Sequence, residues 1–457
     1  MPINTTQLTT DFQTRLNNLG IETPEEILSL TAALNNLTSN RFMSVTFYSQ
    51  LPDLTTNSIP SGSLVFVEQL NVLMMSVGTQ WLGVDGRTLG AVIATNYAWG
   101  NNGSGRLGDN TTTNRSNLVA VVGGITTWSQ VSAGQSFSLG ITSAGVAYGW
   151  GYNGYGGLGD NTSTGKSSPV TVVGSLNWSK VSAGSIHSLG MTSAGVAYGW
   201  GNNNSGRLGV NDTTARSSPV SIVGGLIWSQ VSAGVQHSVG LTTSGVAYGW
   251  GYNAVGAVGD NTATNRSSPV SVAGGLSWSQ VTAGGAHSLG ITSSGVAYAW
   301  GRNHHAQLGD ITQVNRSSPV SVVGGITTWS QLSGSPSGNS GYNHSLGIAA
   351  GVAYAWGSGD EARLGDGSSS SGTVRSSPVT VLGGITNWSQ IKAGGRHSLG
   401  LTSTGIAYAW GNNQDGQGGN NVETRSASPV VISGGLIGWS QISAGINHSL
   451  AIYAYGS

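Results

Sequence analysis

Short apolar stretches separated by glycine, asparagine and serine recur about every 50 residues from residue 92 to the C-terminus. The clearest copy runs from Gly145 to Gly195 and contains VAYGWG, SPVTVVG, WSKVSAG and HSLGMT. These stretches are too short for helices and are rich in β-branched and aromatic residues, so they indicate four β-strands. A four-stranded unit repeated at a fixed period predicts the blade of a β-propeller.

Three markers recur in step and set the number of units. The Trp-Gly pair ends one strand, a second tryptophan begins the motif Trp-Ser-Gln or Trp-Ser-Lys, and His-Ser begins another strand. The Trp-Gly tryptophans, which we expect to be structural, are Trp99, Trp150, Trp200, Trp250, Trp300, Trp356 and Trp410. The second set is Trp128, Trp178, Trp228, Trp278, Trp329, Trp388 and Trp439. The third is His187, His237, His287, His344, His397 and His448, with Phe137 in the first copy. Seven copies predict a mainly β fold with seven blades.

The two ends of the repeat array are complementary. The first unit begins with a Trp-Gly strand and lacks a preceding His-Ser strand, whereas the last unit ends on its His-Ser strand. We therefore expect residues 92–99 to pair with residues 447–453 and close the ring, which leaves no open sheet edge at the seam. Prolines such as Pro169 and Pro219 are predicted at strand starts, where the missing N–H is tolerated.

Residues 1–40 have a helical pattern instead. Apolar residues between Leu8 and Leu19 lie at helical spacing, and Thr23-Pro24-Glu25-Glu26 is a helix start followed by a short heptad-like stripe. Because such a short helix needs a partner surface, we expect this region to anchor or oligomerise the chain, with a trimer favoured. The alternative is a helical hairpin packed on its own chain.

Residues 41–91 predict a small β module and a junction. The candidate strands are Ser63–Val67, Val72–Val77 and Gln80–Val84, and residues 85–91 form the junction. The predicted domains are therefore residues 1–40 for anchoring, 41–91 for the module and 92–457 for the propeller.

Composition removes several functional classes. Only 7% of the residues are charged, the net charge is zero and cysteine is absent. We expect no nucleic-acid binding, which needs clustered Lys and Arg, and no disulfide or thiolate chemistry. No signal peptide or membrane span is visible in the pattern.

The repeated polar residues invite a catalytic or metal-binding interpretation. A ring of histidines could line a channel, but Phe137 breaks it, and a repeated structural hydrogen bond is the favoured interpretation. The recurring aspartates, such as Asp109 and Asp260, lack the further carboxylates of a calcium site and favour a turn tied to a nearby Arg. We expect no enzyme activity, no cofactor and no metal.

The turn after each Trp-Gly pair varies most, and variation on a rigid scaffold is where recognition usually resides. An insertion at Ser333–Asn343 adds to this variation. The candidate surface-binding residues are Tyr152, Tyr155, Tyr252, Arg302, His304, His305 and Tyr342. The alternative is neutral drift on solvent-exposed loops.

The combination AYxWGxNxxGxLG, SSPV and WSQVSAGxxHSLG resembles the regulator of chromosome condensation repeat over residues 92–457. This resemblance implies a seven-bladed propeller closed by strand exchange between the termini. The founding member acts on a small GTPase and binds chromatin, but the loops of this chain are short and nearly uncharged. The segment from Leu51 to Gly83 resembles a module of bacteriophage tail-fibre proteins.

The two resemblances together favour a structural virion appendage of a bacteriophage, such as a tail fibre. In this hypothesis the N-terminal region attaches to other virion proteins, and the propeller is exposed on the virion to recognise a host glycan or surface protein. The alternative is a cellular propeller scaffold or exchange-factor-like regulator that binds a partner protein. A polysaccharide-degrading spike is a third hypothesis.

Overall fold

A computed structural model describes residues 93–455 except 338–342, 371 and 433–435, together with four strands nearer the N-terminus. The contacts divide the chain into two units, residues 93–455 and residues 1–92 with the last two residues. The predicted helices within residues 1–40 lie outside the described residues.

The N-terminal unit contains one four-stranded sheet. Its strands are β1 (Phe42–Val45), β2 (Leu64–Val67), β3 (Val72–Val77) and β4 (Gln80–Gly83), in the order β1-β2-β3-β4. The sequence pattern predicts β2, β3 and β4, which pair antiparallel. It does not predict β1, which pairs parallel to β2.

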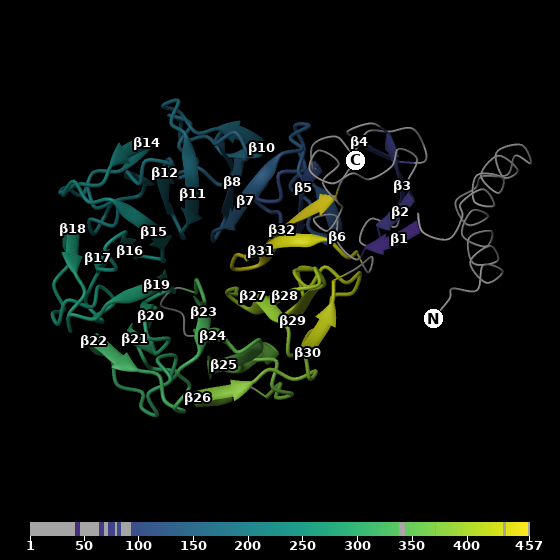
Figure 1. The fold of residues 1–457 in the computed structure, drawn as a ribbon. Coiled ribbons are helices and arrows are strands. Elements are labelled where there is room, and N and C mark those ends of the chain that lie inside the picture. The colour runs from purple at the N-terminus through teal and green to yellow at the C-terminus, as the bar shows by residue number, and fades with distance from the viewer. Residues whose placement is uncertain are drawn as a thin grey trace, which may run out of the picture. The chain divides into compact units, whose positions relative to one another are not determined.

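The second unit is a seven-bladed β-propeller, with one strand of each blade near the centre and one at the periphery (Figure 1). From the innermost strand outward, the blades are: blade 1, β7 (Trp128–Ala133), β8 (Phe137–Thr142), β9 (Ala147–Gly151), β10 (Lys166–Thr171); blade 2, β11 (Trp178–Ala183), β12 (His187–Thr192), β13 (Ala197–Gly201), β14 (Arg216–Ser221); blade 3, β15 (Trp228–Ala233), β16 (His237–Thr242), β17 (Ala247–Gly251), β18 (Arg266–Ser271); blade 4, β19 (Trp278–Ala283), β20 (His287–Thr292), β21 (Ala297–Gly301), β22 (Arg316–Ser321); blade 5, β23 (Trp329–Gly334), β24 (His344–Ala349), β25 (Val352–Ser358), β26 (Val374–Thr380); blade 6, β27 (Trp388–Ala393), β28 (His397–Thr402), β29 (Ala407–Gly411), β30 (Ser426–Val431); and blade 7, β31 (Trp439–Ala444), β32 (His448–Tyr455), β5 (Ile93–Gly100), β6 (Arg115–Ala120).

Blade 7 confirms the predicted closure. Strand β32 from the C-terminus pairs antiparallel with β5, in a register that runs from His448 opposite Gly100 to Tyr455 opposite Ile93. This pairing is longer than the equivalent pairing in blade 2, which joins five residue pairs. The seam of the ring is therefore an extended ladder and leaves no open edge.

The prolines do not begin their strands as predicted. Pro169 lies inside β10, three residues after the strand begins at Lys166. The pairing of β10 with β9 shifts register between Lys166 and Val170, so Pro169 falls within a β-bulge of an outermost strand. Neither a bulge nor an outer edge needs the N–H that proline lacks.

Each hydrophobic core lies between two neighbouring blades and contains two tryptophans. In blade 3, Trp228 and Trp250 lie with ring centroids 5.6 Å apart, and Tyr248 packs edge-on against Trp228. Both tryptophans are buried, with 2% and 0% exposure. Gly240 provides the space for Trp228, because a Cβ at Gly240 would lie 2.5 Å from the Trp228 ring.

The blades are joined by a repeated polar contact at a loop carbonyl. Between blades 2 and 3, the Arg207 carbonyl accepts from Trp250 Nε1 at 2.9 Å and from Ser238 Oγ at 2.8 Å. His187 Nε2 lies 2.9 Å from the same Ser238 Oγ. The tryptophan and serine bonds recur at all seven blade junctions, and the histidine bond at six.

This contact confirms the structural interpretation of the histidines and fixes their protonation. Because Ser238 Oγ donates its single hydrogen to the carbonyl, His187 Nε2 must donate to Ser238 Oγ, so the ring carries a proton on Nε2. The lowered pKa of the buried ring leaves Nδ1 unprotonated, so the imidazole is neutral. Burial lowers the pKa of all six histidines, to about 3 for His237 and about 4 for His287. Phe137 fills the seventh position, so Ser188 receives no imidazole.

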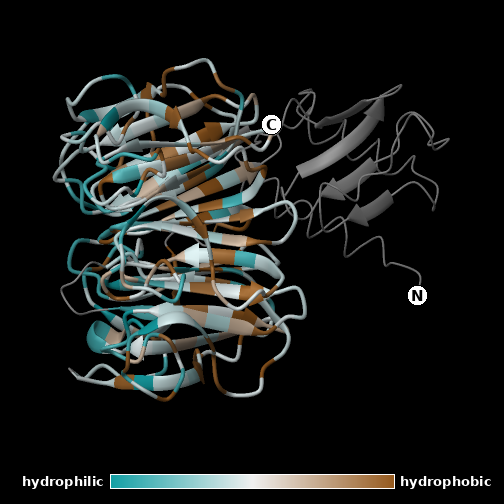
Figure 2. Ribbon diagram, turned by 90° about the vertical axis from the view of Figure 1, so that its left-hand side faces the viewer, coloured by the Kyte–Doolittle hydropathy of each residue, from teal (hydrophilic) through white to brown (hydrophobic). Residues whose placement is uncertain are grey.

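The loops form two faces at opposite ends of the strands. One end carries the loops between the innermost and second strands and the long loops between the third and outermost strands, and we call it the long-loop face. The other end, the turn face, carries the tight turns and the connections to the next blade. Seen edge-on, hydrophilic residues gather along one side of the propeller (Figure 2).

Replacing Gly240 with alanine should destabilise the propeller by about 1–3 kcal/mol, because the added methyl overlaps the Trp228 ring. The measurement is the thermal unfolding midpoint. Ala451 occupies the equivalent position in blade 7, where Trp439 packs against Tyr97 and Tyr453. Ala451→Gly is the matched control and should not reproduce the loss. An unchanged midpoint for Gly240→Ala would contradict this packing.

The six buried histidines predict that the fold begins to lose stability at a pH above the range in which carboxylates become protonated. Each folded-state pKa is lower than the unfolded value near 6.5, so the unfolded chain binds more protons, and stability falls as the pH drops from about 6.5 towards 4. At pH 5 each histidine should cost about 2 kcal/mol relative to pH 8. Unfolding midpoints between pH 8 and 4.5 measure this loss. His237→Phe, which copies Phe137, should reduce the slope, and a midpoint constant over that range would refute the assignment.

Candidate functional site

Six of the seven sequence candidates lie on the long-loop face, in the loops of blades 1, 3 and 4. Tyr152 and Tyr155 belong to the long loop of blade 1, where their ring centroids are 6.2 Å apart and 41% and 45% of each residue is exposed. Tyr252 lies in the same loop of blade 3, and residues 302–305 lie in that of blade 4. Tyr342 lies outside the described residues.

The long loop of blade 4 holds a strained, exposed isoleucine that the sequence analysis missed. Ile311 has a φ of 57° and is 68% exposed. The equivalent residues with φ of 61–65° are all asparagine, namely Asn110, Asn161, Asn211, Asn261 and Asn421. Asparagine tolerates this left-handed conformation, whereas for a β-branched residue it is an outlier.

The backbone around Ile311 is the same as in the other blades. Ile311 N donates to Ser376 O of the next blade at 3.0 Å, as Asn110 N donates to Ser167 O at 2.9 Å. The fold therefore imposes the conformation, and the isoleucine side chain adds strain and an exposed apolar surface. Val314 in the same loop is 58% exposed. Ala306 has a φ of 57° and stands where most other blades have a glycine. The signal in the sequence was GDITQVN in place of GDNTTTN.

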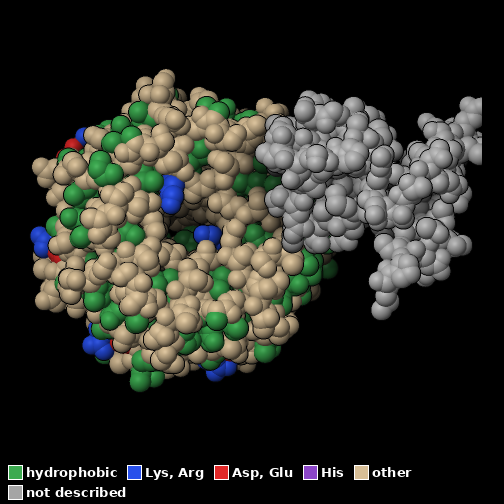
Figure 3. Space-filling model, viewed as in Figure 1, with side chains coloured by type: hydrophobic (Ala, Val, Ile, Leu, Met, Phe, Trp, Pro, Cys, Tyr) green, Lys and Arg blue, Asp and Glu red, His purple; other side chains and the backbone are tan. Residues whose placement is uncertain are grey.

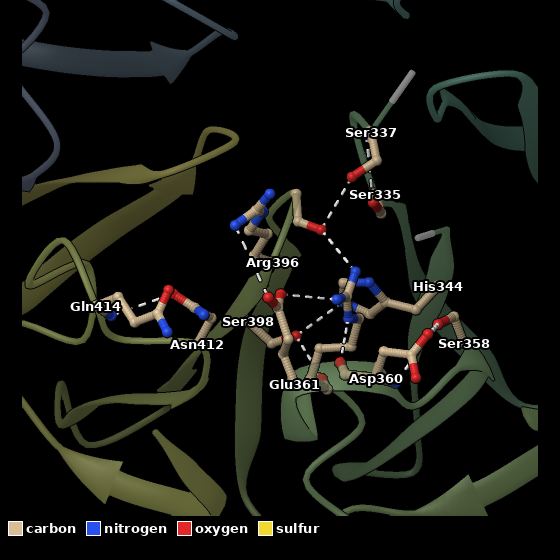
Figure 4. A network of polar contacts seen from close by, with 12 residues as sticks. Ser335, Ser337, His344, Ser358, Asp360, Glu361, Arg396, Ser398, Asn412 and Gln414 are labelled. Carbon is tan, nitrogen blue, oxygen red and sulfur yellow. Dashed lines mark hydrogen bonds and ion pairs between the residues drawn. The ribbon is translucent and has the colours of Figure 1, made fainter. Parts of the chain in front are cut away.

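The adjacent loop of blade 5 departs from the repeat through a short 3-10 helix, η2 (Asp360–Ala362). Glu361 and Ala362 within it have positive φ values of 59° and 64°. Glu361 Oε2 accepts from the buried guanidinium of Arg363 at 2.9 Å, and Glu361 Oε1 lies 3.8 Å from Arg396 Nη1 of blade 6 (Figure 4). Glu361 is thus held between two cations.

The same network ties the blade 5 insertion to blade 6. The Gly395 carbonyl accepts from Arg363 Nη1 at 2.9 Å and from Ser337 Oγ at 2.9 Å (Figure 4). On the other side, burial and Arg302 lower the pKa of His305, while Asp360 opposes this shift. Hydrogen bonds and an ion pair thus join the loops of blades 5 and 6, and the bond from Ile311 N to Ser376 O joins the blade 4 loop to blade 5. We call residues 302–314, 335–337, 358–363 and 396 the blade 4–6 sector.

The charges elsewhere on this face are mostly paired at the rim. Asp109 and Arg115 lie 2.9 Å apart, and hydrogen bonds from Thr111, Arg115 and Asn102 overcome burial to lower the pKa of Asp109. Equivalent pairs join Asp212, Asp260, Asp310 and Asp366 to Arg216, Arg266, Arg316 and Arg375. These pairs confirm the predicted Asp-to-Arg turns and stabilise the loops.

The described residues offer contact surface and no catalytic constellation. No three His, Asp or Glu side chains gather among them as metal ligands would. The ring serines donate to carbonyls beside neutral, buried histidines, so they form no nucleophile–base pair. Two shallow hollows of about 400 and 340 Å³ are repeat-equivalent, and a tyrosine is the single titratable residue in the lining of each. No described helix is long and apolar enough to span a membrane.

Comparison with known proteins identifies the propeller. A family model described as the RCC1-like domain matches residues 89–388, and models of the regulator of chromosome condensation repeat match residues 388–417 and 404–452. The crystal structure of human WBSCR16 is 22% identical with a TM-score of 0.68, covering 79% of this chain and 98% of that one. Yeast RCC1 (Prp20), solved bound to Kap60, is 18% identical with a TM-score of 0.69, covering 80% and 90%.

A sequence relative is much larger than this chain. Human HERC2, an E3 ubiquitin-protein ligase, is 35% identical over 105 residues, which are 22% of this chain and 2% of HERC2. Mouse HERC2 matches to the same extent. The chain therefore spans a small fraction of these curated relatives.

The comparisons contradict the predicted bacteriophage appendage. The relatives found are cellular proteins of human, mouse and yeast, so the virion location, the attachment to other virion proteins and the recognition of a host glycan or surface protein are wrong predictions. The reported family matches begin at residue 89 and give no support to the tail-fibre resemblance of the preceding segment. The predicted homo-oligomer rested on residues 1–40, which lie outside the described residues.

The family model covers residues 89–388 of the 457, and its repeats continue to residue 452. The observed seven blades and the closure between β32 and β5 agree with the fold that the resemblance implies. The chain therefore belongs to the RCC1-like domain family of seven-bladed propellers.

Proposed function

We propose that this protein is a partner-binding propeller of the scaffold or regulator type, and that a partner protein docks on the blade 4–6 sector of the long-loop face. The observation that carries the proposal is Ile311, an exposed β-branched residue in the left-handed conformation. Such a residue costs about 1–2 kcal/mol, and strain of this kind clusters at functional sites.

The composition of the sector suits a protein partner. Ile311 and Val314 supply exposed apolar side chains. Arg302, at the start of the same loop, and Arg396, in a loop of blade 6, supply cations. An apolar contact bordered by polar groups is the usual anatomy of a protein interface. Glu361, held by Arg363 and 27% exposed at its side chain, adds a carboxylate in a fixed position.

The relatives are consistent with a binding role for this fold. Prp20 has been solved bound to Kap60, and its binding properties to Gsp1p and histones have been described. Propellers supply a rigid scaffold whose function depends on loops, so these particular partners do not transfer with the fold. We propose a non-enzymatic role because the repeated serines and histidines are engaged in the buried hydrogen bonds that join the blades.

Replacing Ile311 with asparagine and Val314 with threonine should abolish partner binding without destabilising the fold. Asparagine relieves the strain at residue 311, so we expect an unchanged or higher unfolding midpoint. Loss of the apolar contact should reduce capture of the partner at least tenfold. Quantitative affinity capture with cross-linking, from extracts of cells that make the protein, measures this loss and identifies the residues in contact.

Ile227→Ser is the matched control, because Ile227 is 51% exposed on the turn face. A partner lost equally from both variants, or retained by both, would contradict the proposed surface. The identified partner also decides between scaffold and regulator. If it is a small GTPase, a nucleotide-release assay separates the two: acceleration by the wild-type chain and not by the Ile311→Asn, Val314→Thr variant identifies a regulator, and no acceleration by either identifies a scaffold.

A further inference from the structure

Side chains of the innermost strands form two rings of hydrogen bonds around the axis. At the third position of these strands, glutamine Oε1 accepts from the backbone N–H of the next blade at 2.6–3.3 Å, as Gln130 does from Val181. At the fifth position, a serine Oγ accepts from the next blade at 2.9–3.0 Å, as Ser132 does from Ala183. These bonds satisfy N–H groups that a strand edge would otherwise leave unpaired.

Lysine replaces one residue in each ring, and Thr282 replaces the fifth-position serine in β19. Lys180 replaces the third-position glutamine in β11, and Lys392 replaces the fifth-position serine in β27. Because a lysine ammonium has no acceptor, Val231 N and Ala444 N have no side-chain acceptor in the preceding blade. All six equivalents of Val231 N have one, as do five of the six equivalents of Ala444 N. The chain thus gives up two junction hydrogen bonds to place two cations on the innermost strands.

These cations have no counter-charge of their own. The seven innermost strands contain no Asp or Glu, and within the described residues neither lysine makes a hydrogen bond or ion pair. Lys180 is exposed, Lys392 is partly buried, and burial lowers the pKa of the Lys392 ammonium. Basic side chains are visible at the central opening (Figure 3). A partly desolvated cation without a partner is costly, so a compensating anion is favoured.

The overall charge supports this location. Residues 93–455 contain 14 Lys and Arg against ten Asp and Glu, although the whole chain is neutral. The rim aspartates are largely consumed by the pairs with Arg115, Arg266, Arg316 and Arg375. The uncompensated positive charge of the propeller therefore includes the two lysines on the innermost strands.

We propose that the central channel binds a small oxyanion, a phosphate or a carboxylate, between Lys180 and Lys392. Blades 2 and 6 lie on opposite sides of the ring, and the innermost strands run in the same direction. Lys392 is two positions further along its strand than Lys180, so it lies about 7 Å nearer the long-loop face at ~3.3 Å per residue. The hydroxyls of Ser443 and Ser132 line the same level and can contribute hydrogen bonds.

The test uses the full chain and isothermal titration with inorganic phosphate, and separately with acetate, at constant ionic strength set with sodium chloride. The proposal expects saturable one-to-one binding of at least one of the two anions. Phosphate alone identifies a phosphate site, and acetate alone a carboxylate site. Lys392→Ser should weaken binding at least tenfold, Lys180→Gln should weaken it, and Lys392→Arg should retain it.

The unfolding midpoints of Lys392→Ser and Lys180→Gln control for loss of folding in these two variants. Both restore the side chain that the other blades use, so without anion their unfolding midpoints should equal or exceed that of the wild-type chain. Absence of saturable binding of either anion in the millimolar range would overturn the proposal. Equal affinities in the wild type, Lys392→Ser and Lys180→Gln would also overturn it, because the anion would then bind elsewhere.

Discussion

The architecture depends on one carbonyl per blade junction. The carbonyl of a long loop accepts from a tryptophan and a serine of the next blade, and six of the seven serines accept in turn from a histidine of the preceding blade. Each group is buried, so a missing partner would leave an unsatisfied polar atom in the core. This contact fixes the long loop, the second strand and the third strand together, and it explains why the Trp-Gly and His-Ser markers recur in step.

The same constraint separates residues that must be kept from residues that are free to differ. The loop backbone is fixed at its carbonyl and at the left-handed residue that donates to the next blade, and the residue after the carbonyl, such as Leu208 or Leu308, is fully buried. Ile311 stands at the left-handed position and Glu361 lies two residues before the Arg363 carbonyl. Their side chains take no part in the carbonyl contact, and both residues have a positive φ. The lysines on the innermost strands are also departures with a local cost, because each replaces a side chain that accepts a hydrogen bond from the next blade. Departures that cost stability in a regular scaffold are the strongest indications of function.

Much of the fold could be predicted because its determinants repeat. Seven tryptophan pairs indicated the blade number, the complementary ends predicted the pairing of β32 with β5, and the repeated His-Ser motif indicated the structural hydrogen bond between blades. The candidate site was predicted only in part. The asparagine that Ile311 replaces is a signal for the left-handed conformation that the sequence prediction did not use. Nothing in the sequence shows that Arg363 is buried against Glu361, because that contact depends on the register of loops between blades. The predicted functional class was wrong because it rested on the tail-fibre resemblance of a short segment, from Leu51 to Gly83, which the family matches do not support.

The protonation state of the ring histidines tests the central claim most directly. Two-dimensional NMR that correlates the imidazole nitrogens with the ring protons distinguishes the tautomers and follows each ring with pH. The structure predicts that His187, His237, His287, His344, His397 and His448 are neutral, carry the proton on Nε2 and do not titrate between pH 8 and 5 while the chain stays folded. Rings protonated on Nδ1, or titration near pH 6.5 in the folded protein, would contradict it.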